Sequence, residues 1–375
     1  MNIYSSPTVL VERFFHNDAR LSSKCVMIFT PGFTYELGLP CENVKMMLEA
    51  GYDVVFLQTS INDYHQSLPL DFIQKLSITL KKEYTEIFGF GASMGGYAAL
   101  AFSQFFNFSS ILVFGPYYSI LEEFDNRYPE RAKKINWIYH VRGCGAGFSG
   151  KIFVAYDPYI IDKLHYEKIE AEFSQADVTP IPIRFGSHPP SLWLKDAGVY
   201  DSFVLSIFND GVVHDLNQKK YRINNKIYLT GLGHFLANNK NKYKSALYVL
   251  HLAVNLGDNR HGTYNSLSIL YSRQGDYVKA VEFGRLAVQV VSDAMNAAKS
   301  SEIANKYVKY CSANEKHLSK VLRKSFQFTE ANKVICLARA RNPKKFSLLI
   351  EQAKVLFLMS VLFFHKKFQP KNVIK

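Results

Sequence analysis

A serine flanked by two glycines is the part of this sequence with the clearest capacity for chemistry. Residues 91–95 read Gly-Ala-Ser-Met-Gly, between a short apolar run and an Ala-rich run. A strand, a sharp turn and a helix in that order give this pattern its meaning, because the turn lifts the serine hydroxyl clear of the sheet. Gly91 and Gly95 supply the space that such a turn needs. We therefore predict that Ser93 is a nucleophile; a glycine-rich loop without a catalytic role is the alternative.

A serine hydroxyl is a weak nucleophile, so it needs a general base, and the base needs a third group that fixes its tautomer. Asp157 directly follows the apolar segment 151–156, and His234 follows the segment 226–231. We expect both segments to be strands of a parallel sheet, and such sheets bind ligands outside the carboxyl ends of their strands. The expected triad is therefore Ser93, His234 and Asp157.

Two other histidines are alternatives as the base. His188 and His214 both lie in the long connection over residues 171–225. We favour His234 because the Gly-x-Gly before it allows a loop to carry the ring back over the serine.

The acid also has alternatives. Asp157 is followed by a proline, and an Asp-Pro pair often only initiates a turn. Asp201 and Asp210 lie in the same long connection as the two alternative histidines. Asp162 and His165 follow on the next expected helix, where we expect them on the solvated face.

The first 244 residues alternate between apolar runs and segments with helical spacing. Strands are expected within 8–17 and at 25–30, 52–57, 85–90, 109–115, 151–156 and 226–231, with helices at 42–51 and 71–82. Strands separated by helix-length connections indicate an α/β fold, a mostly parallel sheet with helices on both faces.

With these residues in place, the chain resembles the α/β-hydrolase superfamily over residues 8–244, in the manner of a serine esterase. The resemblance implies an oxyanion hole made by the backbone N–H groups of Met94 and Phe33. Many members carry His-Gly in the second of these loops, where this sequence has Pro31-Gly32. Because the donor is a backbone amide, this difference leaves the chemistry possible.

The charge divides the chain into two parts. Residues 245–375 contain 21 Lys and Arg against 8 Asp and Glu, a net charge of +13, whereas residues 1–244 contain 24 of each. Strand patterns nearly disappear after residue 244 and helical periodicity takes over. We expect a catalytic domain over 1–244 and a basic helical domain over 245–375.

One segment of the helical part, residues 267–287, resembles a tetratricopeptide (TPR) unit. The residues that carry this resemblance are Leu267, Tyr271, the turn 275–277, Ala280 and Ala287. Small residues at the last two positions suit helices that cross closely. Ser268 and Gly284 depart from the pattern, where Gly or Ala and an aromatic residue are usual.

Composition limits the remaining possibilities. The 375 residues are 48% hydrophobic and suffice for two domains. The five scattered cysteines form no C-x-x-C pair, so neither a disulfide framework nor a zinc site is expected. The N-terminus lacks the features of a signal peptide, and the longest apolar run, 355–364, is about half of a membrane span. We expect a cytoplasmic protein without a metal or cofactor.

The expected partners follow from the same features. The substrate would be a small-molecule or glycan ester, bound beneath aromatic and arginine side chains of the segments 116–150 and 171–225. The helical domain could dock a protein partner, and no nucleic-acid motif accompanies its basic charge. The apolar helix near 346–364, flanked by lysine pairs, permits contact with a membrane surface, although packing on a neighbouring helix is favoured.

The sequence therefore predicts a serine hydrolase that acts on an ester. An acylated carbohydrate is one possible substrate. Two alternatives remain open. The first is a non-enzymatic scaffold that retains a degenerate hydrolase fold. The second is an acyltransferase that uses the same serine nucleophile.

Overall fold

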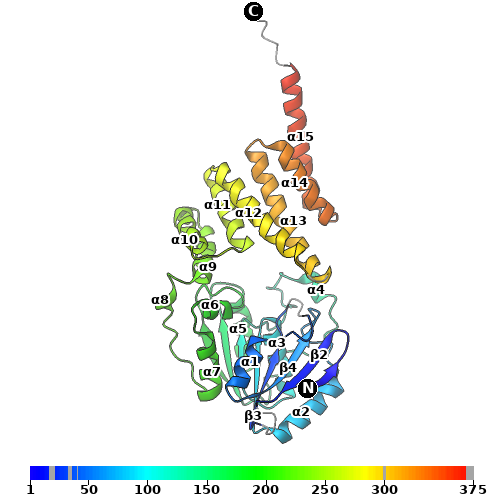
Figure 1. Cartoon of the computed structure of the whole chain (residues 1–375), viewed down its shortest axis with the longest axis vertical. Coiled ribbons are helices and arrows are strands. Elements are labelled where there is room, and N and C mark those ends of the chain that lie inside the picture. Colours follow the sequence, from blue (N-terminus) through cyan, green and yellow to red (C-terminus); the bar gives the residue numbers. More distant parts are fainter. Residues whose placement is uncertain (17–21, 33–35, 40, 299–300, 369–375) are drawn as a thin grey trace, which may run out of the picture. The chain divides into compact units, whose positions relative to one another are not determined.

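The chain divides into two compact units, Met1–Gly231 and Leu232–Lys375. The computed structural model (Figure 1) describes residues 1–16, 22–32, 36–39, 41–298 and 301–368. Composition had suggested a boundary after residue 244. The division falls earlier because helix α9 (Lys226–Ala237) runs from the end of the first unit into the second.

An eight-stranded sheet forms the centre of the first unit, in the order β1-β2-β4-β3-β5-β6-β7-β8. The pairs β1–β2 and β2–β4 are antiparallel, and every other neighbouring pair is parallel. The strands are β1 (Asn2–Ser5), β2 (Val9–Phe14), β3 (Lys24–Phe29), β4 (Asp53–Thr59), β5 (Glu86–Ala92), β6 (Phe108–Phe114), β7 (Lys151–Tyr156) and β8 (Asp177–Pro182).

Helices cover both faces of this sheet (Figure 1), so the expected α/β fold class is confirmed. Side chains alternate between the faces along each strand. On β3, Met27 and Phe29 pack in the layer of α2, α3 and α5, whereas Val26 and Ile28 pack in the layer of α1, α6 and α7. The helices of this unit are α1 (Glu42–Glu49), α2 (Leu70–Glu83), α3 (Met94–Ala101), α4 (Pro129–Ala132), α5 (Asp162–Glu172), α6 (Ser191–Asp196), α7 (Tyr200–Asp210) and α8 (Gln218–Tyr221), with a short 3₁₀ turn at Phe102–Gln104.

The last parallel strand is β8, and the strand expected at 226–231 is instead part of helix α9. Two prolines hide β8 in the sequence, because proline lacks an N–H and is confined to edge strands. Ile183, directly after β8, donates its N–H to the carbonyl oxygen of Tyr156 on β7 (2.8 Å). Since backbone groups alternate in direction along a strand, Pro180 and Pro182 occupy positions whose N–H would point away from β7.

The second unit consists of helices, and each helix from α11 to α15 packs on the next one along the chain. Ala280 and Ala287 are fully buried there, consistent with close helix crossings. No helix among the described residues is long and apolar enough to pass through a lipid bilayer. The helices are α10 (Tyr243–Asn255), α11 (His261–Gln274), α12 (Tyr277–Asn296), α13 (Ser301–Lys324), α14 (Phe328–Arg341) and α15 (Phe346–Phe368), preceded by a 3₁₀ turn at Lys240–Lys242.

Ser268 and Gly284, the two departures from the repeat pattern, compensate for each other. Ser268 donates its hydroxyl hydrogen to the carbonyl oxygen of Ala280 (2.6 Å), and its oxygen lies 2.9 Å from Nε2 of His317. A Cβ at position 284 would lie 3.2 Å from the Ser268 oxygen and 3.1 Å from Leu318. The missing side chain therefore leaves the room that the polar group at 268 occupies.

His317 is kept neutral inside this packing. Because Ala280 takes the hydroxyl hydrogen of Ser268, the hydrogen shared with His317 belongs to the histidine Nε2. Burial, with Lys320 and Lys324 nearby, lowers the pKa of His317 to about 4.

We predict that protonation of His317 destabilises the second unit. Histidine in an unfolded chain titrates at about 6.5, so between pH ~6.5 and ~4 the unfolded state takes up a proton that the folded unit excludes. Stability is therefore unaffected above pH ~6.5, falls as the pH drops through this window and levels off below pH ~4, with a total loss of about 3 kcal/mol. Hydrogen exchange of the α11 and α13 amides, corrected for intrinsic rates, measures the loss.

His317→Gln keeps a side-chain N–H for Ser268 but cannot titrate. Its second unit should therefore lose less stability over the same pH range than that of the wild type. His214→Gln, which removes an exposed histidine of the first unit, is the control and should match the wild type. Equal losses of stability in His317→Gln and the wild type would contradict the role of His317 protonation.

Candidate active site

Ser93 occupies a strained turn between β5 and α3. Its backbone has φ 54° and ψ −116°, and its N–H donates to the carbonyl oxygen of Phe114 (2.8 Å). A Cβ on Gly91 would lie 2.3 Å from the carbonyl oxygen of Gly95, and one on Gly95 would lie 2.3 Å from that of Phe29. These backbone contacts require glycine at both positions, and they place the hydroxyl at the carboxyl end of the sheet.

The structure brings Ser93 together with His188 and Asp162. The Ser93 Oγ lies 2.8 Å from the His188 Nε2, and the His188 Nδ1 lies 2.9 Å from Oδ2 of Asp162. Asp162 is 1% exposed and His188 is 22% exposed, so the relay runs from a buried carboxylate to a partly exposed hydroxyl. A carboxylate on Nδ1 leaves the hydrogen on that nitrogen, and Nε2 is then free to accept the serine proton. The chain order serine, acid, histidine is the expected one.

The expectation that His234 is the base was wrong. His234 lies on α9 in the second unit, where burial lowers its pKa, with Arg260 and Asp258 as its charged neighbours. The prediction depended on a strand at 226–231 that is helical. The position beside Ser93 is filled by His188, one of the alternatives, which follows the edge strand β8.

Asp157, the acid expected from the sequence, holds the loop that carries the base. Its carboxylate accepts hydrogen bonds from the N–H groups of Ser187 (2.9 Å) and Tyr159 (3.0 Å). Burial raises the pKa of Asp157. Its side chain therefore fixes the backbone next to His188, while Asp162 is the acid that meets the imidazole.

Asp162 and His165 are not on a solvated helix face, as the sequence had suggested. Both are buried, at 1% and 0% exposure, because the first two turns of α5 pack beneath the loop after β6. The N–H of Tyr118 in that loop donates to Nδ1 of His165 (3.2 Å), so the Nε2 hydrogen of His165 donates to Asp125 (3.1 Å).

A buried ion pair lies behind Asp162. Arg127 binds Asp125 through two hydrogen bonds of 2.8 Å, and its Nη1 lies 3.7 Å from Oδ1 of Asp162. Burial opposes ionisation of Asp125, but the bonds from Arg127 and His165 hold its pKa well below the usual range. Arg127 thus places positive charge beside the carboxylate that faces His188.

Gly115 makes room for the histidine–carboxylate pair. It follows β6 with φ 53°, a conformation that favours glycine. A Cβ at this position would lie 2.9 Å from Nδ1 of His188 and 3.0 Å from Oδ2 of Asp162.

Tyr117 adds a hydroxyl group next to His188 and Ser93. This group lies 3.3 Å from the His188 Nε2. The side chain is 3% exposed, and burial raises its pKa far above the ordinary value, so the hydroxyl remains protonated. The guanidinium of Arg127 lies over its ring at 4.9 Å, which fixes the ring in place.

One expected oxyanion donor lies within the described residues. Met94 begins α3 directly after Ser93, and N–H groups in the first turn of a helix have no partner within the helix. Phe33, the second expected donor, lies outside the described residues. Its neighbour Gly32 is close to the elbow, since a Cβ there would lie 3.5 Å from Cβ of Met94.

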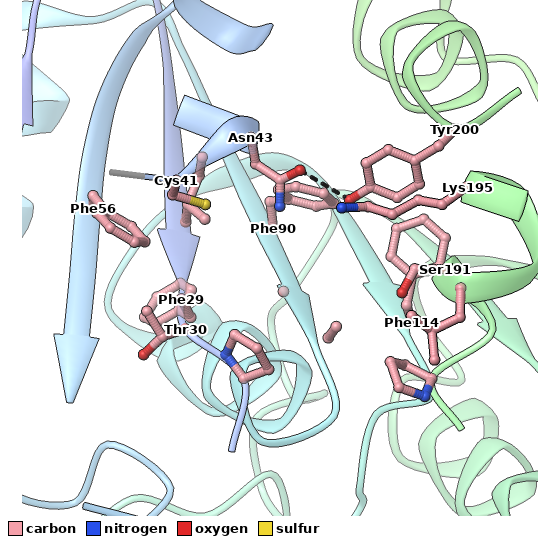
Figure 2. Close-up of a pocket in the computed structure, with 16 residues that line it drawn as sticks. Phe29, Thr30, Cys41, Asn43, Phe56, Phe90, Phe114, Ser191, Lys195 and Tyr200 are labelled. Carbon is pink, nitrogen blue, oxygen red and sulfur yellow. Dashed lines mark hydrogen bonds between the residues drawn. The ribbon is translucent and has the colours of Figure 1, made fainter. Parts of the chain in front are cut away.

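A cavity of about 200 Å³ adjoins the elbow at the carboxyl ends of β3 and β5 (Figure 2). Its wall includes Ala92, which directly precedes Ser93, and Pro189, which directly follows His188. Four phenylalanines line it: Phe29, Phe56, Phe90 and Phe114.

On another side of this cavity, the Tyr200 hydroxyl donates to Oδ1 of Asn43 (3.1 Å), and Figure 2 shows Lys195 next to this pair. The cavity is therefore mainly apolar with one polar wall. The segments 116–150 and 171–225 were expected to cover the substrate with aromatic side chains. Two of these side chains, Trp193 and Tyr139, belong to the core instead, with exposures of 0% and 2%.

No protein-family model and no curated protein matches the chain. The chain is similar to several solved structures. Est1E from Butyrivibrio proteoclasticus is 10% identical, and the match covers 56% of this chain and 99% of Est1E with a TM-score of 0.36. A sugar hydrolase (YeeB) from Lactococcus lactis is 13% identical, and the match covers 68% of this chain and 99% of YeeB with a TM-score of 0.36. Mouse alpha/beta hydrolase domain-containing protein 10 is 9% identical, and the match covers 56% of this chain and 99% of the mouse protein with a TM-score of 0.36.

The α/β fold of the first unit is similar to that of α/β serine hydrolases, and a run of helices follows it. At these low identities the resemblance concerns the fold. The activity of this chain is argued from its own residues below.

We predict that Asp162→Asn and Asp157→Asn have very different effects. An amide at 162 no longer fixes the tautomer of His188, so the rate of acylation at Ser93 should fall by about 10⁴-fold. An amide at 157 still accepts one of the two backbone hydrogen bonds, so the rate should fall by less than about 10-fold. Labelling of Ser93 by a fluorophosphonate measures both rates, and a loss at 157 as large as that at 162 would reverse the assignment.

Proposed function

We propose that the protein is a serine hydrolase that cleaves carboxylic esters with Ser93, His188 and Asp162. The observation that carries this proposal is the unbroken relay from the Ser93 hydroxyl to the buried Asp162, at 2.8 and 2.9 Å. The strained turn at Ser93 adds support, because it holds the nucleophile ahead of a helix N-terminus.

In the proposed reaction, the Ser93 oxygen forms a bond to the ester carbonyl carbon while His188 takes the serine proton at Nε2. The N–H of Met94 donates to the developing oxyanion, and such a donor is worth about 3–4 kcal/mol. Collapse of the tetrahedral intermediate breaks the carbon–oxygen bond to the alcohol, which leaves with the proton from His188. Water then attacks the acyl-enzyme by the same steps and restores Ser93.

Tyr117 would assist departure of the alcohol. The leaving oxygen must come within hydrogen-bonding reach of the His188 Nε2, and the Tyr117 hydroxyl lies 3.3 Å from that nitrogen. Tyr117 follows β6, whereas β3, after which the second oxyanion donor is expected in the sequence, lies on the other side of β5. This arrangement favours a hydrogen bond to the leaving oxygen over one to the oxyanion.

The cavity beside the elbow would hold the acyl part of the substrate. A cavity of roughly 150 Å³ accommodates a benzene ring, so about 200 Å³ suits an acyl group with six to eight carbon atoms. The wall of Asn43, Lys195 and Tyr200 would meet a polar substituent on that group. The alcohol, for which a sugar is one candidate, would lie on the side of Tyr117.

We predict that a fluorophosphonate labels the wild type and that Ser93→Ala abolishes the labelling. His188→Ala should slow it by a factor on the order of 10⁴ to 10⁶, because the serine loses its base. His234→Gln is the matched control and should label like the wild type. Labelling that survives in Ser93→Ala would contradict the nucleophile, and an inert wild type would favour the scaffold alternative.

An ester panel then separates the remaining alternatives. Esters that vary in acyl length, together with O-acetylated sugars, define the preference for acyl group and alcohol. If an added sugar resolves the acyl-enzyme faster than water does, the acyltransferase alternative is favoured.

Replacement of Tyr117 by phenylalanine should slow esters with poor leaving groups more than esters with good ones. Loss of a hydrogen bond to a partly charged oxygen corresponds to about 1.5–3 kcal/mol, or roughly 10- to 100-fold in kcat/KM for an alkyl ester. A p-nitrophenyl ester of the same acid needs no such help and should change little.

Tyr118→Phe is the matched control, since its hydroxyl bonds to Glu172 and does not face the triad. The comparison uses kcat/KM for the two esters on each variant. Equal losses for both esters in Tyr117→Phe would indicate a structural role instead.

A further inference from the structure

Helix α15 of the second unit has two apolar faces, and only one of them is covered. Leu348 and Val355 are fully buried against the preceding helices. Glu351 on the same face is 2% exposed and binds Arg323 (2.9 Å). This is the packing on a neighbouring helix that the sequence favoured.

The opposite face of α15 is exposed and apolar. Its residues recur at spacings of three and four, which places them on one stripe of the helix. Phe346 and Phe357 are 71% and 68% exposed. The large apolar side chains of this stripe are Phe346, Leu349, Ile350, Leu356, Phe357 and Val361.

The acidic side chains of α14 and α15 are both held in ion pairs, Glu330 with Arg285 and Glu351 with Arg323. Lys344 and Lys345 are exposed just before the helix, and Lys354 is exposed beside the stripe. The occupant of the stripe must therefore offer apolar contact and negative charge together.

A second copy of this chain does not meet that requirement. Lys344 and Lys345 precede the stripe and Lys354 lies beside it, and all three are exposed. Pairing of two such stripes would bring surfaces of like charge together, which is destabilising.

We propose that the exposed stripe of α15 docks on an anionic lipid bilayer. A bilayer surface is layered, with phosphate and carboxylate at headgroup level and hydrocarbon beneath. The stripe has matching chemistry, since its phenylalanines and leucines can enter the boundary while the lysines beside it and before it remain at headgroup level. The helix lies along the surface in this arrangement and does not cross it.

The test uses the full chain and vesicles of defined composition. Flotation with phosphatidylcholine vesicles is compared with flotation on vesicles that contain phosphatidylserine as well. We expect at least tenfold tighter binding to the anionic vesicles, weakened by added salt because screening acts on the lysines.

Ile350→Ser with Phe357→Ser should reduce binding to anionic vesicles at least tenfold. Val278→Ser with Tyr248→Ser removes two exposed apolar side chains elsewhere in the same unit and should bind like the wild type. Lys344→Gln with Lys345→Gln should bind several-fold more weakly and show a flatter salt dependence.

Two outcomes would overturn the proposal. The first is a wild type that does not float with anionic vesicles, or an Ile350→Ser, Phe357→Ser variant that floats equally well. The second is a wild-type dimer in gel filtration that this variant converts to a monomer without any vesicle binding, which would assign the stripe to a second copy. Neither outcome depends on activity at Ser93, so the proposed hydrolase function is tested separately.

Discussion

The buried carboxylate of Asp162 is the group on which the arrangement of the candidate active site depends. A buried charge is tolerated only where partners compensate for its lost hydration. Here the partners are the His188 Nδ1 at 2.9 Å, the Arg127 Nη1 at 3.7 Å and the positive N-terminal end of α5. These partners come from segments far apart in the chain, so the cost of burying one carboxylate ties several loops together. Gly115 belongs to the same constraint, because a larger residue would occupy the place of the pair formed by His188 and Asp162.

The sequence contained enough information to predict the elbow and the class of fold, because both follow from local patterns. The elbow needs glycine where backbones touch, and the buried parallel strands are continuous apolar runs. The histidine that lies beside Ser93 could not be found in this way. Proline interrupts the pattern of β8, and the segment 226–231 has the β-branched and aromatic residues of a strand although tertiary packing makes it helical. Short apolar runs are ambiguous between the two structures.

The two acids illustrate a second limit of sequence reasoning. Asp157 and Asp162 both follow β7, and both are buried. Which one meets the imidazole depends on the path of the loop that carries His188, and that path is set by contacts between distant segments. The signal that could have helped is the polar character of α5 at Asp162 and His165, which suits a helix end packed on buried charges as well as it suits a solvated face.

The proline-containing edge strand has a consequence for how the molecules behave together. An open sheet edge is a template on which another chain can add a strand. Along the outer edge of β8, the N–H groups that such a strand would need are missing at Pro180 and Pro182. The strand that leads to His188 therefore also discourages intermolecular β-sheet growth at this end of the sheet. In a crowded solution, the same two residues would help to keep separate molecules from joining edge to edge.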